Sequence, residues 1–478
     1  MLQLLIGRDK EIELLNMAIN DSESHFIAIY GRRRIGKTYL VREACTNRLT
    51  FQHSGLYDGG MSDQIFAFTA SLSAAGYDFK KKPQNWLEAF EGLKELIRQS
   101  KESRKIIFID ELSWMDTPKS NLIMALENFW NGFASARKDV ILICCSSATA
   151  WMISKVIHNK GGLYNRLTEK IALKPFSLRQ CEDYVHAKGL VLNREQILQY
   201  YMIFGGVPYY WTFLKKGLSL AQNIDEILFS DDAALKDEFK YLYSSIFKNP
   251  DVYYKIVQAL GSKKAGMTRE EIIDATHISN SGDLTLRLEE LESCGFIRRY
   301  NAYGMKKKNA LYQLIDNYTL FYFKYIKNAP GDEHFWSNSI NTPSYNTWCG
   351  FAFERVCLEH IRQIKRKLGI SGVLTEVNSW FCKRDPEKGI FGSQIDMLIV
   401  RKDQVINLCE MKYSVSEYTI TVKDENDINK KINDLVRQTG TGYAIFPTLV
   451  TTKGLVPNTH SGMIQSVVTL NDLFEKEE

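Results

Sequence analysis

Eight consecutive residues near the amino terminus constrain the fold of this chain more than any other segment. They match the pattern GxxxxGK[ST] at every specified position and directly follow an apolar run, His25 to Tyr30. In this pattern the glycines let the backbone curl so that its N–H groups point at a phosphate, the lysine supplies a positive charge and the final hydroxyl reaches Mg²⁺. The segment predicts a strand, a loop that binds a nucleoside triphosphate such as ATP, and a helix; the alternative is an ordinary Gly-containing turn. The candidate nucleotide contacts are Gly31, Arg32, Arg33, Arg34, Ile35, Gly36, Lys37 and Thr38.

A second apolar run, Ile106 to Ile109, ends in two acidic residues, Asp110 and Glu111. Such a strand can place Asp110 beside a Mg²⁺ ion that is also held by Thr38, and Glu111 where it polarises a water for attack on the γ-phosphate. Buried strands often end in a capping Asp, so this run alone is a weak signal. Together with the loop it predicts a chain that binds and hydrolyses ATP with Mg²⁺.

Composition sets broad limits on the remaining possibilities. The chain has 478 residues, which predicts two or three domains, and a formal net charge of only +5, so any nucleic-acid surface must be a local patch. Its nine cysteines lack paired CxxC spacing, which implies neither zinc nor disulfides. The apolar start, Met1 to Ile6, is too short for a signal peptide, and no apolar stretch reaches the roughly 18 residues of a membrane span. We expect a cytoplasmic protein that makes no membrane contact.

The pattern of apolar and polar residues divides the chain into five segments. Apolar strands alternate with amphipathic helices up to about Phe176, which predicts an α/β core with a parallel sheet and helices on both faces. The next segment is helical and is broken by the turn Phe204-Gly205-Gly206-Val207-Pro208. The expected domains are an α/β core at 1–176, a helical lid at 177–250, a winged helix at 251–330, an irregular linker at 331–347 and a second α/β domain at 348–478.

The winged-helix prediction rests on three helix patterns followed by a β-hairpin whose tip carries Lys306, Lys307 and Lys308. In such a domain the third helix can enter a DNA major groove and the tip can reach phosphates. However, the third helix carries Glu289, Glu290 and Glu292, which a DNA backbone would repel. An adaptor that packs on its neighbours, with the lysines in a solvated turn, is therefore an equal alternative.

A second group of acidic residues lies in the last segment, whose elements follow the order α–β–β–β–α–β. One expected strand carries Asp396, and the next carries Glu410 and Lys412 on one face because side chains alternate along a strand. The two acids, with Glu354 from the preceding helix, could bind Mg²⁺, and Lys412 could orient a hydrolytic water. A solvated strand face is the alternative, but Glu410 lies in an otherwise apolar run where an unpaired acid is costly.

Both groups of motifs resemble known families. Residues 7 to about 330 resemble the archaeal-type ATPases of the AAA+/STAND superfamily, through the phosphate loop, Ile109-Asp110-Glu111, the strand end Ser146-Ser147 and the Gly-Gly-Val-Pro turn. The segment from Trp348 resembles the restriction-endonuclease-like PD-(D/E)xK domain, through Phe353-Glu354, Ile395-Asp396, Glu410-Met411-Lys412 and Thr451-Thr452-Lys453-Gly454. No Pro precedes Asp396, and Met411 is larger than the usual middle residue.

The first resemblance implies roles for further residues. Ser146 or Ser147 would be a polar sensor of the γ-phosphate or of the attacking water, and Arg166 would reach the nucleotide or would be a surface arginine in a loop. Pro208 would lie in the turn that contacts the adenine side. Relatives of this kind can assemble, so self-association is a further implication.

Taken together, the sequence predicts an ATP-binding and ATP-hydrolysing switch coupled to a Mg²⁺-dependent, DNA-directed nuclease-like domain. The alternative is a regulatory or signalling ATPase that cleaves nothing, whose carboxy-terminal domain only binds nucleic acid or a protein partner. A kinase is a weaker interpretation, since nothing like a phosphoacceptor site accompanies the loop.

Overall fold

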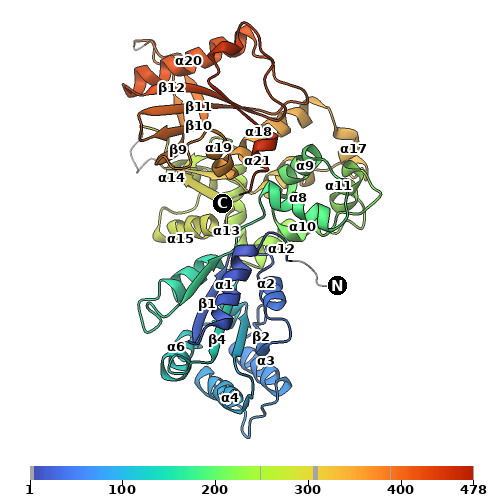
Figure 1. Cartoon of the computed structure of the whole chain (residues 1–478), viewed down its shortest axis with the longest axis vertical. Coiled ribbons are helices and arrows are strands. Elements are labelled where there is room, and N and C mark those ends of the chain that lie inside the picture. Colours follow the sequence, from blue (N-terminus) through green and yellow to red (C-terminus); the bar gives the residue numbers. More distant parts are fainter. Residues whose placement is uncertain (1–4, 248, 305–309, 388, 477–478) are drawn as a thin grey trace.

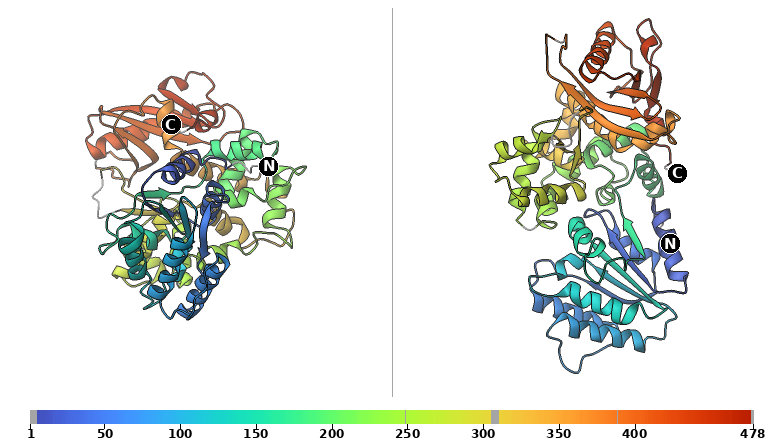
Figure 2. Two further views of the ribbon diagram at one scale, coloured as in Figure 1. Left: turned by 60° about the horizontal axis from the view of Figure 1, so that its bottom comes forward. Right: turned by 90° about the vertical axis from the view of Figure 1, so that its left-hand side faces the viewer.

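The amino-terminal part of the chain forms a five-stranded parallel sheet at one end of an elongated molecule (Figures 1 and 2). The computed structural model describes residues 5–247, 249–304, 310–387 and 389–476. The strand order is β2-β3-β4-β1-β5, and every neighbouring pair is parallel, as the alternation of strands and helices predicts. The strands are β1 (His25–Tyr30), β2 (Leu49–Ser54), β3 (Lys105–Asp110), β4 (Val140–Ser146) and β5 (Glu169–Ala172).

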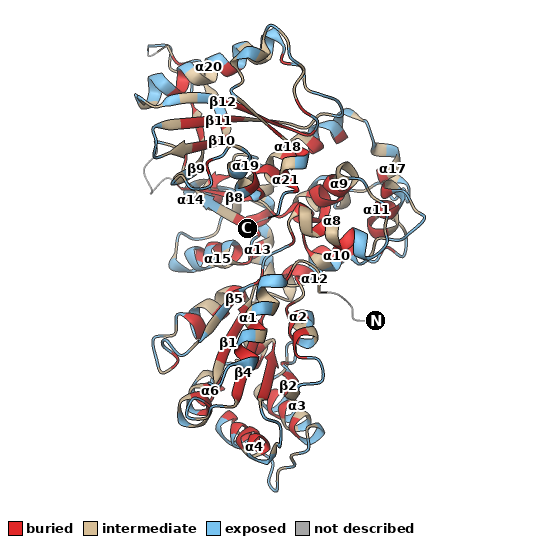
Figure 3. Cartoon of the chain, viewed as in Figure 1, coloured by how far each residue is buried: buried red, intermediate tan, exposed pale blue. Residues whose placement is uncertain are grey.

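Helices cover both faces of this sheet because the central strands bury alternate residues on opposite sides. Ile27 and Ile29 of β1 pack against α1 and α2, whereas Phe26 and Ala28 pack against α3, α4 and α6. The helices are α1 (Asp9–Asn20), α2 (Lys37–Ala44), α3 (Met61–Ala74), α4 (Trp86–Gln99), α5 (Leu112–Met115), α6 (Leu122–Phe129) and α7 (Thr149–Trp151), with π-helical turns at Trp130–Ala134 and Met152–Ile157. Figure 3 shows that the strands form the buried centre of this domain.

Five helices follow and form the expected helical segment beside the core. They are α8 (Leu178–Ala187), α9 (Arg194–Phe204), α10 (Pro208–Trp211), α11 (Leu220–Leu228) and α12 (Glu238–Ser244). The turn between α9 and α10 depends on Gly205, which adopts a φ of 60°. Gly206 allows a close backbone approach, since a Cβ there would lie 1.8 Å from the carbonyl oxygen of Phe176.

The elements predicted for a winged helix are present in the next segment. A three-stranded antiparallel sheet with the order β6-β8-β7 accompanies three helices. The predicted basic tip, Lys306 to Lys308, lies outside the described residues. The elements are α13 (Pro250–Gly261), β6 (Met267–Thr268), α14 (Arg269–Thr276), α15 (Gly282–Ser293), β7 (Ile297–Tyr300) and β8 (Leu311–Leu314), followed by α16 (Asn317–Phe321) and a π-helical turn at Tyr322–Ile326.

The prediction of an irregular linker at 331–347 is wrong. Helix α17 (Phe335–Ser339) lies in this segment, and α18 (Pro343–Glu359) begins there. Trp336 and Tyr345 are buried, and the backbone N–H of Trp336 donates to the Asp225 carboxylate at 2.8 Å. Pro343 does not break a helix but begins one, because a proline at the first helical position loses no intrahelical hydrogen bond.

The carboxy-terminal domain forms a mixed five-stranded sheet with the order β13-β12-β11-β10-β9. The first three strands are antiparallel neighbours, and β12 and β13 add in parallel. The predicted α–β–β–β–α–β order is present, and β13 and α21, which were not predicted, follow it. The elements are α19 (Ile361–Lys367), β9 (Thr375–Cys382), β10 (Ser393–Arg401), β11 (Val405–Lys412), α20 (Val422–Thr439), β12 (Ala444–Thr451), a 3₁₀ turn at Ser461–Met463, β13 (Ser466–Thr469) and α21 (Leu470–Leu473).

One hydrophobic core joins this domain to the helices in the middle of the molecule. Buried residues of α18 lie between Met397, Cys409 and Met411 of the sheet and the core of the helical and winged-helix segments. The opposite face of the sheet packs Leu408 against Leu435 of α20. None of the helices within the described ranges combines the length and hydropathy that crossing a membrane requires.

Candidate functional site

The phosphate-type loop lies between β1 and α2, and two glycines shape it. Gly31 adopts a φ of 143°, and a Cβ there would lie 2.3 Å from the carbonyl oxygen of Leu173. Gly36 adopts a φ of 88° and forms the N-cap of α2. Both conformations are strained for residues with a side chain, so the two fixed glycines of the motif are required by backbone geometry.

Lys37 points back into the loop. Its Nζ donates to the carbonyl oxygens of Gly31 at 2.9 Å and Arg32 at 3.0 Å, and the side chain is buried. Burial lowers the pKa of this ammonium group, an effect that the nearby carboxylates of Glu111 and Asp110 oppose. The loop therefore concentrates one positive charge where its backbone curls.

Thr38 and Asp110 meet across the carboxyl ends of β1 and β3. The Thr38 hydroxyl donates to Asp110 Oδ2 at 2.5 Å, and the backbone N–H of Glu111 donates to the other carboxylate oxygen at 3.0 Å. Burial raises the pKa of Asp110. A hydroxyl and a carboxylate in contact are hard oxygen ligands of the kind that Mg²⁺ prefers, so these two residues fit the expected metal.

Glu111 is held by the end of β4. Its carboxylate oxygen Oε2 accepts hydrogen bonds from the Ser147 backbone N–H at 3.0 Å and from the Ser147 hydroxyl at 2.7 Å. Ser146 instead donates its hydroxyl to Ser113 at 2.9 Å. Of the two candidate sensor serines, Ser147 is therefore the one that contacts Glu111. Glu111 itself has a left-handed backbone, with a φ of 47°.

The side chains of the three arginines of the loop have different partners. Arg32 donates to Asp316 Oδ1 at 2.6 Å, and Arg34 forms an ion pair with Glu238 of α12. The Arg33 guanidinium lies 5.9 Å from the centre of the Trp114 ring. The charges of Arg32 and Arg34 are thus neutralised by other parts of the chain. Arg33 forms no ion pair among the described residues, so its guanidinium and the backbone N–H groups of this run remain candidates for phosphate contact.

The Arg32–Asp316 pair is buried, with 7% and 4% of the two side chains exposed. Burial alone would lower the pKa of Arg32, but the Asp316 carboxylate outweighs this effect and holds that pKa above its ordinary value. The guanidinium of Arg32 therefore stays charged inside the protein, and Asp316 is its partner.

The remaining predicted contacts lie at different distances from the loop. Pro208 occupies the first position of α10, next to Tyr209, whose backbone N–H donates to the Arg34 carbonyl oxygen at 3.3 Å and whose ring lies 4.2 Å from the Arg34 guanidinium. Arg166 is exposed in the segment before β5, and no hydrogen bond or ion pair in the described part of the chain joins its side chain to the loop. The nucleotide role expected for Arg166 has no support from this geometry.

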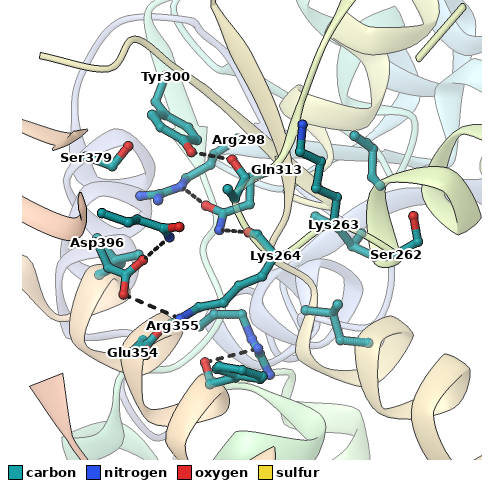
Figure 4. A pocket seen from close by; sticks show the side chains of 18 of the residues that line it. Ser262, Lys263, Lys264, Arg298, Tyr300, Gln313, Glu354, Arg355, Ser379 and Asp396 are labelled. Atoms are coloured by element: carbon teal, nitrogen blue, oxygen red, sulfur yellow. Dashed lines mark hydrogen bonds and ion pairs between the residues drawn. The ribbon is translucent and has the colours of Figure 1, made fainter. Parts of the chain in front are cut away.

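Two acids of the carboxy-terminal domain share one lysine at the edge of a cavity of about 340 Å³ (Figure 4). Lys264, in the turn after α13, lies 2.6 Å from Glu354 of α18 and 3.4 Å from Asp396 of β10. Its ammonium also lies 4.4 Å from the centre of the Phe351 ring. Burial, and then the Asp396 carboxylate, raise the pKa of Glu354 to about 7, although Lys264 opposes the change.

Glu410 and Lys412 lie on the other side of the sheet. Glu410 forms an ion pair with Lys431 of α20, and the Lys412 ammonium lies 6.0 Å from the centre of the Tyr418 ring. Cys409 and Met411, which flank Glu410, face the α18 core instead. The prediction that Asp396, Glu410 and Lys412 converge with Glu354 on one cation is therefore wrong for this structure. Among the described residues, no group of three or more His, Cys, Asp or Glu side chains is arranged to hold a metal ion.

Sequence reasoning missed Asp316, Glu238 and Lys264. Each lies 130 residues or more from the motif residue that it contacts: Asp316 is 284 residues from Arg32, Glu238 is 204 from Arg34, and Lys264 is 132 from Asp396. None of the three belongs to a local motif. The sequence offers one indication, for Asp316 alone: it is a charged residue within a mostly apolar stretch, which suggests a buried partner.

Two comparisons with known proteins differ in how much of the chain they cover. Residues 5–212 match the model of a family described as "ATPase domain predominantly from Archaea". The chain is 26% identical over 440 residues to an uncharacterized protein of Methanocaldococcus jannaschii, which covers 91% of this chain and 92% of that protein.

Two further similarities concern nucleotide-binding proteins. An uncharacterized ATP-binding protein of Methanocaldococcus jannaschii is 36% identical over 45 residues, which is 9% of this chain and 76% of that protein. Among solved structures, the Walker-type ATPase PABY2304 of Pyrococcus abyssi has a TM-score of 0.47 and 15% identity, and the match covers 67% of this chain and 96% of that one.

Proposed function

We propose that the protein is a switch that binds and hydrolyses ATP, since residues 5–212 match the model of an ATPase domain found predominantly in Archaea. One observation carries the proposal: three strand ends bring Lys37, the Thr38–Asp110 contact and the Glu111–Ser147 contact together. These are the groups that a phosphoryl-transfer site needs, namely a cation, metal ligands and a carboxylate that can accept a proton.

Each residue has one role in the proposed reaction. Lys37 neutralises charge on the phosphates, and the backbone N–H groups of the loop cradle them. Thr38 and Asp110 would hold Mg²⁺, which when bound neutralises negative charge on the transferred phosphoryl group. Glu111 accepts a proton from the attacking water, and Ser147 keeps its carboxylate oriented towards the end of β4.

Contacts of the loop with the helical segment support the switch. Arg34 pairs with Glu238 of α12, and Tyr209 of α10 contacts the loop through its backbone and its ring. A nucleotide that reorders the loop therefore changes the surface on which these helices rest. Binding would favour one arrangement of the helices, and hydrolysis would release it.

For the carboxy-terminal domain we favour a role that does not involve cleavage: binding of nucleic acid or of a protein partner. The acids expected to share one metal lie on opposite sides of the sheet, and each is paired with a lysine. A Mg²⁺-dependent nuclease that acts on DNA is the second candidate. The observation that favours it is the meeting of Glu354 and Asp396, since two carboxylates at one edge of a cavity can attract a divalent cation.

Two assays on the full-length protein test these proposals. In calorimetry with ATP and Mg²⁺, Lys37→Ala should abolish binding, whereas Lys174→Ala, which changes an exposed lysine, should not. Binding that survives Lys37→Ala would refute the loop assignment. In a nuclease assay on plasmid, linear and single-stranded DNA with Mn²⁺, with and without ATP, the non-cleaving function predicts no product. Cleavage that Asp396→Ala abolishes would establish the nuclease instead.

A further inference from the structure

Two neighbouring residues at the start of α16 contact one arginine from the amino-terminal domain and one from the carboxy-terminal domain. Arg32, in the phosphate loop, donates from Nη1 to Asp316 Oδ1 at 2.6 Å. Arg355, in α18 of the carboxy-terminal domain, donates from Nε to Asn317 Oδ1 at 3.1 Å. A single peptide step therefore joins the candidate nucleotide site to the domain that carries Glu354 and Asp396.

Both carboxylate oxygens of Asp316 accept hydrogen bonds, one of them from Arg32 of the loop, which fixes the position of this side chain. Its second oxygen accepts the backbone N–H of Thr319 at 2.9 Å and so caps α16. Within the described residues Asp316 supplies the only hydrogen bond to the Arg32 guanidinium, whose Nε and Nη2 atoms are buried without one. Arg32 cannot move far without taking the start of α16 along or leaving a buried charge unpaired, which is costly.

The start of α16 is also packed against the helical segment. Thr319 and Tyr243 of α12 share a hydrogen bond of 3.0 Å between their hydroxyls. A Cβ on Gly205, in the turn between α9 and α10, would lie 3.4 Å from the side-chain Nδ2 of Asn317. A shift of the start of α16 would therefore change contacts with the helical segment as well as with α18.

We propose that Asp316 positions the phosphate loop and that the Asp316–Asn317 step couples nucleotide binding to the carboxy-terminal domain. The inference rests on the proposed ATP binding. The Lys37 ammonium donates to the Arg32 carbonyl oxygen, and a bound phosphate attracts that same ammonium. Nucleotide therefore alters the hydrogen bonding at the Arg32 backbone, its side chain passes the change to Asp316, and Asn317 passes it to Arg355. Coupling of this kind is reciprocal, so whatever holds α18 also changes nucleotide affinity.

The test compares full-length variants by calorimetry with AMP-PNP and Mg²⁺ and by hydrogen exchange of the α18 amides. In the wild type, nucleotide should change α18 exchange rates by at least about fivefold, the lower end of usual coupling factors. Asp316→Asn keeps a side chain that caps helices but removes the charge, and it should weaken nucleotide affinity by at least about fivefold and abolish the α18 response. Asn317→Ala leaves the Arg32–Asp316 pair intact, so its affinity should stay within about twofold of wild type while the α18 response is lost.

Glu238→Gln is the matched control. It removes a buried carboxylate from Arg34 of the same loop. Among the described residues Glu238 forms its ion pair with Arg34 and its side-chain hydrogen bond with Tyr210, and neither partner belongs to α18, so the α18 response should persist. If Asp316→Asn fails to fold, Asn317→Ala and Arg355→Met test the other arm. The inference is overturned if wild type binds nucleotide without an α18 response, or if Asn317→Ala keeps the full response. A wild type that binds no nucleotide at all would refute the ATPase proposal as well.

Discussion

Glu354 should make the stability of the protein depend on pH in a direction that a single substitution can remove. Its side chain is 16% exposed and faces Asp396. Burial, followed by the Asp396 carboxylate, raises the pKa of Glu354 from 4.5 to about 7, although Lys264 favours the charged form. Glu354→Gln replaces the acid by a group of the same shape that resembles its protonated form at every pH.

The sign of the effect follows from proton linkage. Between pH 4.5 and about 7 the folded protein holds a proton on Glu354 that the unfolded chain has lost, so the free energy of unfolding falls as the pH rises through this window. The contribution is fully present below pH 4.5 and lost above about pH 7. A shift of this size corresponds to about 3 kcal/mol, since one pKa unit is equivalent to about 1.4 kcal/mol.

Urea unfolding monitored by tryptophan fluorescence between pH 5.5 and 8.5 measures the difference in free energy of unfolding between Glu354→Gln and wild type. The stability of Glu354→Gln relative to wild type should rise with pH and gain about 2 kcal/mol between pH 5.5 and 8.5, because the first part of the total change falls below pH 5.5. Glu410→Gln is the control: it removes another carboxylate of the same domain and leaves Lys431 without its partner, so it should show no such gain. Parallel pH profiles for Glu354→Gln and wild type would refute the reasoning, as would a difference that shrinks with pH.

Three further substitutions test other parts of the structure. Gly31→Ala should destabilise the protein by about 2 kcal/mol or more and abolish ATP binding. The reason is that the new Cβ would lie 2.3 Å from the Leu173 carbonyl oxygen, at a backbone φ of 143°. Normal ATP binding and normal stability of this variant would contradict the loop geometry. Glu111→Gln should reduce ATP turnover by about 10²- to 10⁴-fold while calorimetry still detects ATP binding, and unchanged turnover would remove its assignment as the base. Lys264→Met should lower the free energy of unfolding in urea by about 1–3 kcal/mol, which is more than the effect of Lys263→Met. Lys263 pairs with the more exposed carboxylate of Glu271, whereas Lys264 pairs with Glu354. Equal effects would show that the ion pair of Lys264 does not stabilise the protein.

The amino-terminal fold was predictable because its signals are local. Apolar runs give the five strands, and the order of strands and helices gives a parallel sheet. The meeting of Thr38 with Asp110 also follows from the sequence, since the carboxyl ends of all parallel strands of one sheet lie at the same edge, and Thr38 lies in the first turn of the helix after β1. The start of α18 at Pro343 was missed because proline signals both a helix start and an irregular segment, and only tertiary packing distinguishes them.

The carboxy-terminal site was mispredicted for a different physical reason. Alternation along β11 correctly places Glu410 and Lys412 on one face, but β10 has a register shift between Ile395 and Leu398, which includes Asp396. An extra residue in a strand breaks the period of two, so a residue within the bulge no longer faces the side that counting predicts. Asp396 accordingly shares Lys264 with Glu354 of α18, and Glu410 pairs with Lys431 of α20. Counting along the sequence cannot reveal such an insertion.

The variable positions of the phosphate loop show how the site depends on the rest of the chain. The motif leaves these positions unspecified, and three arginines there would add three positive charges beside Lys37. The structure neutralises two of them with carboxylates that belong to other segments, Glu238 in the helical segment and Asp316 at the start of α16. The electrostatic field at the loop is therefore fixed only when those segments are docked, because undocking would remove both carboxylates and leave two more positive charges beside Lys37. Nucleotide binding and docking of these segments are then linked equilibria. A partner that binds the undocked state of the carboxy-terminal domain must therefore change the affinity for nucleotide by the same factor by which nucleotide changes the affinity for that partner.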